Sequence, residues 1–319
     1  MKTRRWTPLF IVALLVAGSG SRANANLFSD NFEMLVVAER AKDVSADAGK
    51  PTSYVAFDGG YIEAGDPIAG DSAPTPRQVR QYLESALEAQ GFKSGGTTPN
   101  LVLIYHWGVI RIDHREIAVP FQIKRNLEAR IAVVSTELLG ADVDNHFRSH
   151  AEANGENENA SSPTLLVGPL ATVVQQARLP RIFIVVSAFD YQSLAQHHEA
   201  KLVWTAKLSA QESAGDMTEV IPPLIAKGAA FFGQDFPDVR IIQARLESHP
   251  SEAVPANFNA QPSPESYNLD KGVLNGLFRA QRIKYWDPTS GPTAADRIAP
   301  RSSARSGSMG QRCRRASRS

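Results

Sequence analysis

Two long apolar runs set the strongest limit on how this chain folds. One covers residues 101–112, and the other covers residues 181–190. Continuous runs of this kind are typical of strands that are buried on both faces, because a half-exposed strand would alternate apolar and polar residues. The sequence therefore predicts two buried strands, and the second contains five apolar residues in succession, Ile182, Phe183, Ile184, Val185 and Val186.

A third strand is predicted over residues 201–209, where the side chains alternate. One face carries Leu202, Trp204, Ala206 and Leu208, and the other carries Lys201, Val203, Thr205 and Lys207. This alternation favours an antiparallel pair with residues 181–190, joined across residues 192–199, in which the second strand has one solvated face. A further strand is expected over residues 53–63, with a bulge or bend at Gly59-Gly60.

The clearest helix begins after residue 75. Thr75 suits the N-cap, Pro76 the first helical position and Gln78 the closing position of a capping box. Gly91 is a typical residue at a helix end. One apolar face is formed by Val79, Tyr82, Leu83, Ala86 and Leu87.

Other helices are expected near residues 30–41, 121–139, 164–177 and 216–232. The first is inferred from the pair Asp30 and Glu33 and from helical spacing of apolar residues. Residues 239–247 fit a helix and a strand equally well. Strands and helices do not alternate regularly, which favours an α+β fold: a single mixed, largely antiparallel sheet with helices packed on it.

The first 25 residues have the layout of a secretory signal peptide. A basic start is followed by an apolar run over residues 9–17 and by the small-residue site Ala23-Asn24-Ala25. The run is too short for a permanent anchor, so we expect no transmembrane segment in the mature chain. No cysteine near the cleavage site offers a lipid attachment point. We therefore expect an exported protein, periplasmic or extracellular.

The charge of the chain is uneven along its length. The total is +1, but the signal contributes +4 and residues 296–319 contribute +6, so residues 26–295 carry −9. An acidic body is expected to repel nucleic acid. We divide the chain into a signal peptide (1–25), an α+β domain (26–249), a docking segment (250–287) and a disordered basic tail (288–319). The docking segment contains an amphipathic patch, Val273, Leu274, Leu277 and Phe278.

The sharpest polar cluster is a candidate metal site. His146 and His150 are four residues apart, so on a helix both imidazoles would share one face, and Asp142 and Asp144 could complete a shell for zinc. Phe147 stands where the H-E-x-x-H signature has its glutamate. The alternative is a solvated helix end without a metal, and otherwise the sequence indicates no cofactor.

Other polar residues have simpler interpretations. We expect His106 to form one hydrogen bond within a buried strand, and His197-His198 to be exposed turn residues. Residues 113–116 fit a solvated turn, with a general acid/base set as the alternative. The chain has no G-x-S-x-G nucleophile elbow and no P-loop, and Cys313 lies in the tail without positioning for catalysis.

Three pieces of sequence resemble a group of uncharacterised bacterial exported and lipoprotein α+β domains of unknown function, over residues 53–232. They are Phe57-Asp58 followed by the helix 79–90 and Gly91-Phe92, then residues 99–107, then residues 201–206. The chain departs from that group in lacking a lipid-bearing cysteine, in the insert between residues 113 and 181, and in its basic tail. The resemblance implies a small α+β envelope fold and no established chemistry.

These observations lead to a non-enzymatic binding or assembly protein of the cell envelope, whose partner is an envelope protein or a small ligand. One alternative is a metal-dependent hydrolase that uses His146 and His150. Another is a structural protein whose edge strand or tail contacts a partner.

Overall fold

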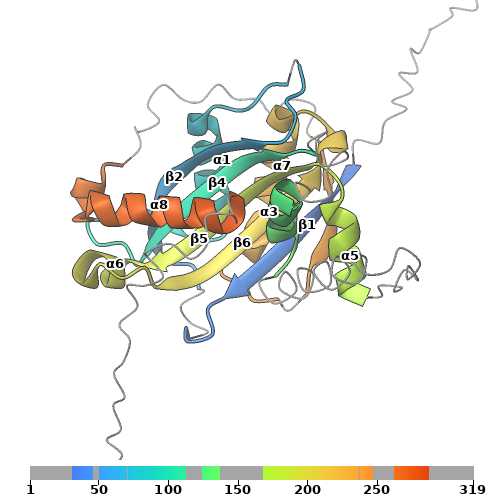
Figure 1. The fold of residues 1–319 in the computed structure, drawn as a ribbon. Helices are drawn as coiled ribbons and strands as arrows, with labels where there is room; N and C mark the ends of the chain where they lie inside the picture. The colour runs from blue at the N-terminus through green and yellow to red at the C-terminus, as the bar shows by residue number, and fades with distance from the viewer. Residues whose placement is uncertain are drawn as a thin grey trace, which may run out of the picture.

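The computed structural model describes residues 31–45, 50–69, 71–112, 124–136, 168–236, 238–246 and 262–286. Within these ranges seven strands form one mixed sheet in the order β3-β2-β4-β5-β6-β1-β7 (Figure 1). The strands are β1 (Asn31–Arg40), β2 (Ser53–Ala64), β3 (Lys93–Ser94), β4 (Leu101–Ile110), β5 (Arg181–Asp190), β6 (Leu202–Gln211) and β7 (Arg240–Arg245). The helices are α1 (Pro76–Ala89), α3 (Lys124–Val134), α5 (Gly168–Ala177), α6 (Tyr191–His197), α7 (Met217–Gly228) and α8 (Lys271–Trp286).

The pairing confirms the predicted α+β class and the largely antiparallel sheet. β4, β5, β6, β1 and β7 pair antiparallel in that order, whereas β2 runs parallel to both β3 and β4. The two apolar runs form the neighbouring inner strands β4 and β5, and their residues are buried on both faces except Asp190. The bulge expected at Gly59-Gly60 is present, because the register between β2 and β4 shifts between Asp58 and Gly60.

The prediction of a helix near residues 30–41 is wrong, since residues 31–40 form strand β1. β1 pairs with β6 on one side and with β7 on the other. Residues 34–38 are all buried, as in the other inner strands. A run of five apolar residues fits a helix face and a doubly covered strand equally well over this length. Pairing on both sides therefore outweighs the local capping signal at Asp30 and Glu33.

The prediction that the strand over residues 201–209 has one solvated face is also wrong. β6 is buried on both faces, and Lys207 is only 3% exposed. Its ammonium group donates a hydrogen bond to the Ser135 carbonyl at 2.8 Å and lies 3.4 Å from a carboxylate oxygen of Glu39. The residues after α3 thus satisfy a charge that the alternation pattern assigned to solvent. The antiparallel pairing of β5 with β6 is confirmed, although helix α6 lies within the connection.

Helices α1 and α7 cover one face of the sheet. The capping box of α1 is formed as predicted, with the Gln78 N–H donating to the Thr75 hydroxyl at 3.3 Å and the Gln78 side chain accepting from the Thr75 N–H at 2.8 Å. Gly91 follows the helix with a φ of +86°, a conformation that favours glycine. The apolar sides of both helices join the largest core cluster with Tyr105, Trp107 and Trp204 of the sheet.

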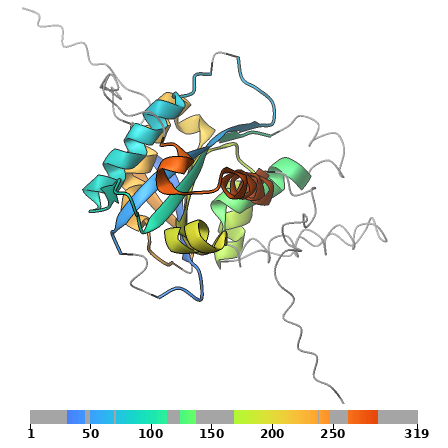
Figure 2. The same cartoon turned by 90° about the vertical axis from the view of Figure 1, so that its left-hand side faces the viewer.

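Helices α3, α5, α6 and α8 cover the other face (Figure 2). Near the start of α8, the sheet residues Phe57 and Ile104 share a core cluster with Leu269, Leu274 and Leu277. The described part of the expected docking segment therefore lies against the sheet. The proposed domain boundaries stay predictions.

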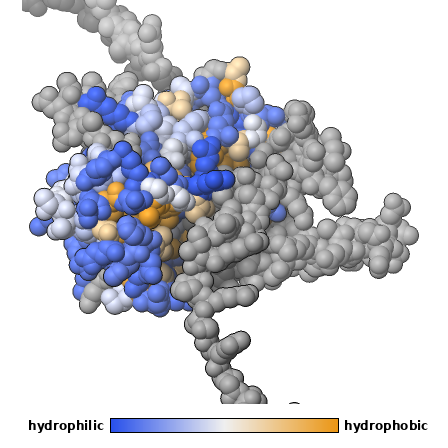
Figure 3. Space-filling model, turned by 60° about the vertical axis from the view of Figure 1, so that its left-hand side comes forward, coloured by the Kyte–Doolittle hydropathy of each residue, from blue (hydrophilic) through white to orange (hydrophobic). Residues whose placement is uncertain are grey.

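The boundaries of several helices differ from the expected ones. α3 ends at Val134, before the predicted residue 139, and α5 begins at Gly168, with Pro169 in its first turn, where proline is well tolerated. The segment 239–247, which fitted a helix and a strand equally well, contains a strand at residues 240–245. None of the helices in the described ranges has the length and apolar character needed to cross a bilayer. In Figure 3 the coloured part of the surface is mainly hydrophilic, with apolar residues visible between the polar ones.

Candidate functional site

The candidate site is built around Arg111, which directly follows β4. Its backbone N–H donates to the Ala64 carbonyl at 2.7 Å, and its own carbonyl accepts from Nη1 of Arg130 at 2.8 Å. Gly65 allows this close approach, because a Cβ atom at that position would lie 2.5 Å from the Arg111 carbonyl oxygen. The Arg111 side chain is only 4% exposed. The chain therefore places a guanidinium group inside the protein at the end of a central strand.

Three carboxylates compensate this buried charge. Nη1 of Arg111 donates to Glu63 at 2.6 Å, Nε donates to Glu212 at 2.5 Å, and Nη2 donates to Asp71. A buried guanidinium without such partners would cost several kcal/mol in lost hydration, on the order of the penalties for unpaired buried ions. Burial alone would lower the pKa of Arg111, but the hydrogen bonds to Glu212 and Glu63 raise it above its ordinary value. Arg111 is thus a permanent cation that fixes three acidic side chains.

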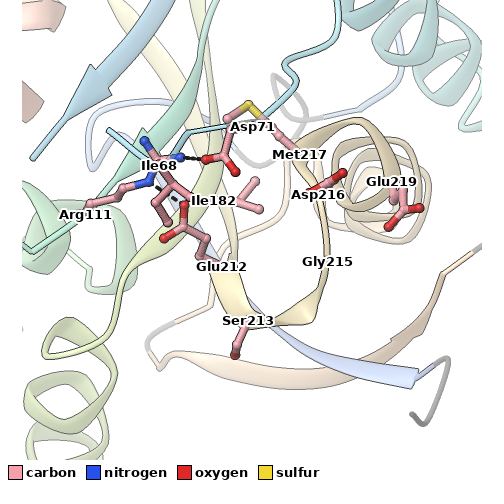
Figure 4. A pocket seen from close by; sticks show the side chains of 10 residues that line it. All are labelled: Ile68, Asp71, Arg111, Ile182, Glu212, Ser213, Gly215, Asp216, Met217 and Glu219. Carbon is pink, nitrogen blue, oxygen red and sulfur yellow. Dashed lines mark hydrogen bonds and ion pairs between the residues drawn. The ribbon is translucent and has the colours of Figure 1, made fainter. Parts of the chain in front are cut away.

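A hollow of about 420 Å³ opens beside this cluster (Figure 4). Its apolar lining consists of Ile68, Ile182 and Met217. Its charged lining consists of Arg111 and the carboxylates of Asp71, Glu212, Asp216 and Glu219. Four carboxylates and a single guanidinium give the lining a net negative charge. The lining comes from the loop after β2, from Arg111 after β4, from the start of β5, from the segment after β6 and from the first turn of α7.

Asp216 and Glu219 lie at the start of α7, apart from the Arg111 cluster (Figure 4). The Asp216 carbonyl accepts the N–H groups of Glu219 and Val220, both at 2.9 Å, so Asp216 is the N-cap residue. Its carboxylate makes no capping hydrogen bond. The positive end of the helix dipole stabilises carboxylates in this first turn. Both carboxylates therefore lie where the helix dipole complements a negative charge.

The loop that closes one side of the hollow is held in place by polar contacts. Asp71 binds Arg111, and its N–H donates to the Ile68 carbonyl at 3.4 Å. The hydroxyl groups of Ser72 and Thr218 lie 3.4 Å apart and connect the loop to α7. Ile68 is 52% exposed at the opening. A large apolar side chain at the mouth of an acidic hollow offers a contact surface for the carbon chain of a ligand.

The lining presents hydrogen-bond acceptors beside apolar side chains. Ser213 lines the hollow, but its hydroxyl is directed to the Gln211 side-chain oxygen at 3.4 Å and not to a general base. Within the described ranges, His, Cys, Asp and Glu side chains form no group of three or more that could hold a metal ion. What the site offers is an array of fixed hydrogen-bond acceptors next to an apolar wall.

Most of the residues singled out from the sequence lie elsewhere. The candidate metal ligands Asp142, Asp144, His146 and His150, and the charged residues 113–116, lie outside the described residues, so these interpretations stay predictions. His197 and His198 are exposed, His197 in the last turn of α6 and His198 as its left-handed C-cap.

His106 is fully buried in β4, as predicted. Its ring lies against Gly59, whose backbone it contacts, and Arg282 of α8 lies near enough to act on its charge. Burial, and to a smaller extent Arg282, lower its pKa to about 4, whereas the hydrogen bond with the Gly59 backbone acts in the opposite direction. A neutral imidazole at physiological pH fits a packed core residue.

Sequence reasoning missed the Arg111 cluster. Glu63 and Glu212 are 48 and 101 residues away from Arg111, so no local spacing connects them. The available signal was the lone arginine near the end of the run 101–112, since a buried guanidinium group there needs hydrogen-bond acceptors from another part of the chain.

A second buried arginine was also missed. Arg181 at the start of β5 is fully buried, and burial lowers its pKa to about 9. It donates to the Gln176 side-chain oxygen and to the Ser209 hydroxyl, both at 2.9 Å. These neutral partners anchor α5 to β6 on the face opposite the hollow, so Arg181 has a structural role.

Comparison with known proteins identifies no family for this chain. No family model matches, and no curated protein matches. Among solved structures, a PDZ domain protein from Parabacteroides distasonis is similar over 69% of this chain and 40% of that chain, with 8% identity and a TM-score of 0.34. The resemblance to exported bacterial domains therefore stays a prediction.

Proposed function

We propose that this protein is an exported, non-enzymatic binding protein that holds a positively charged group in the hollow beside Arg111. The observation that carries the proposal is the lining, which contains four carboxylates and one guanidinium group. That guanidinium group, of Arg111, is already paired with Asp71 and Glu212. An anionic ligand would meet net repulsion there, whereas an ammonium or guanidinium group would gain charge-assisted hydrogen bonds.

Preorganisation supports this proposal. Arg111 holds Asp71 and Glu212 in place before any ligand arrives, so a ligand does not have to order them. Asp216 is the N-cap residue of α7 and Glu219 lies in its first turn, and the helix is a rigid support. Ile68, Ile182 and Met217 can cover a hydrocarbon chain that carries the charged group. A primary amine on an aliphatic chain, free or as a lysine side chain, meets each of these requirements.

A matched series of five-carbon compounds tests the proposed ligand class. We expect isothermal titration calorimetry to show binding of 1,5-diaminopentane, with 1,5-pentanediol and glutarate at least about tenfold weaker. The double variant Asp216→Asn/Glu219→Gln should weaken the diamine by about tenfold or more. The control Glu88→Gln/Glu199→Gln removes the same charge at exposed positions outside the hollow. Equal losses in both double variants would mean that the overall charge, and not the hollow, attracts the diamine.

The proposed compartment rests on the N-terminal sequence. Residues 1–25 lie outside the described residues, and the support is their order of basic, apolar and small residues. Fractionation of the native host with mass spectrometry of the mature N-terminus tests this part. A cleaved form outside the cytoplasm would support export, and a full-length cytoplasmic form would refute it without affecting the ligand proposal.

A further inference from the structure

Strand β7 lies at one edge of the sheet. It pairs with β1 through six residue pairs, and within the described residues no strand pairs with its other side. In an antiparallel pair only alternate residues bond to the neighbour, so the remaining N–H and C=O groups of an edge strand point outward. The opposite edge of the sheet is β3, which is only two residues long. Beyond β3 that edge continues along β2, whereas β7 is itself the terminal strand over its whole length.

The side chains of β7 make this edge unusual on an acidic protein. Residues 26–295 carry a net charge of −9, yet the charged residues of β7 are Arg240 and Arg245, both exposed. The Arg240 guanidinium lies over the Phe236 ring, 3.9 Å from its centre, which limits the positions of the charge. Ile241, which follows Arg240 in the sequence, is 45% exposed. The edge thus combines outward backbone groups, an apolar side chain and two cations.

A second copy of this chain is disfavoured as the occupant. A two-fold pairing of two β7 strands would bring four arginines, Arg240 and Arg245 of each copy, to one interface. Like charges gathered at an interface oppose association. Arginines at an edge discourage such self-association, and the same charges favour a strand with acidic residues at those positions.

We propose that β7 is a strand-addition site for an extended, acidic segment of a partner protein. In an antiparallel arrangement the added strand carries a carboxylate opposite Arg240 and another opposite Arg245, five positions apart, with an apolar residue opposite Ile241. The backbone groups of β7 supply affinity, and the two arginines and Ile241 select the sequence. This site is separate from the hollow, which recognises a positive charge.

Fluorescence anisotropy with labelled six-residue peptides tests the site in the purified protein. The probes are a Thr/Val-rich peptide with glutamate at both ends and an otherwise identical peptide with lysine at both ends. Both are also measured on Asp216→Asn/Glu219→Gln, so that a lysine side chain taken up by the hollow is not counted as binding to β7. We expect the glutamate peptide to bind at least about tenfold more tightly at about 50 mM salt, and the difference to shrink at higher salt. Hydrogen exchange should show new protection at residues 240–245 when the glutamate peptide is bound.

A charge-reversed protein gives the decisive comparison. Arg240→Glu/Arg245→Glu should bind the lysine peptide in preference to the glutamate peptide, a reversal that simple unfolding cannot produce. Asp216→Asn/Glu219→Gln in the hollow should leave binding of the glutamate peptide unchanged, which separates this proposal from the function proposed above. Equal binding of both peptides, protection elsewhere, or a wild-type dimer that protects residues 240–245 without peptide would each overturn the proposal.

Discussion

The pH dependence of stability is predicted from His106 on strand β4. The side chain is fully buried, and its pKa is lowered from 6.5 to about 4, first by burial and second by Arg282. In the unfolded chain the imidazole takes up a proton as the pH falls through about 6.5, whereas in the folded protein it stays neutral until about pH 4. The unfolded state therefore binds more protons in this interval, so stability decreases as the pH falls.

The size of the effect follows from the shift. The two pKa values differ by about 2.5 units, and each unit corresponds to about 1.4 kcal/mol, so His106 alone removes about 3 kcal/mol between neutral pH and pH 4. The full contribution is present above the unfolded pKa and is lost progressively below it. This loss is a large part of the stability of an ordinary domain.

The assay is urea unfolding of the wild type and of His106→Gln from about pH 7.5 to about pH 4. His106→Gln lowers stability at neutral pH, because it alters a packed site, but it lacks this titration. We expect the gap between the two proteins to close, or to reverse, by about 3 kcal/mol at the lower pH. His197→Gln removes an exposed histidine of α6 and serves as the control. Parallel pH profiles for wild type and His106→Gln would refute the reasoning.

Further predictions concern other packed positions and are checked by the free energy of unfolding in urea. Arg111→Met leaves three carboxylates together and should lower the free energy of unfolding by about 2–3 kcal/mol. Arg80→Met breaks only a helix pair with Glu84 and should lower it by about 0.5 kcal/mol. Equal losses in the two variants would contradict the Arg111 cluster. Gly59→Ala places a Cβ 2.3 Å from the His106 ring and should cost about 1–3 kcal/mol, whereas Gly276→Ala on α8 meets no atom within 4 Å and should be neutral or stabilising. Thr75→Ala removes the α1 cap and should cost about 1 kcal/mol; an unchanged midpoint would show that the capping box does not contribute.

Much of the fold could be predicted because the relevant signals are local. The apolar runs of β4 and β5 and the capping box of α1 each lie within a dozen or so residues, and the structure confirms them. β1 was mistaken for a helix because its identity as a strand depends on β6 and β7, which are distant in sequence. The face of β6 that carries Lys207 was assigned to solvent because the cover comes from the residues around Ser135.

The candidate site was less predictable for the same reason. Arg111, Glu63, Asp71 and Glu212 meet only when β2, β4 and β6 lie near one another, and no single stretch of sequence contains a recognisable motif for this arrangement. The lone arginine in the run 101–112 indicates that hydrogen-bond acceptors reach it from elsewhere in the chain, so a polar cluster at this point could be inferred. The identity of those partners could not, because many acidic residues of the chain satisfy the same requirement.

The binding of a cation in the hollow is tested by following backbone amide signals during a titration with 1,5-diaminopentane by nuclear magnetic resonance. The account predicts saturable shifts concentrated at residues 212–219 and near Asp71 and Arg111, and their loss in Asp216→Asn/Glu219→Gln. Shifts scattered over the acidic surface without saturation, or an equal response to 1,5-pentanediol, would contradict it.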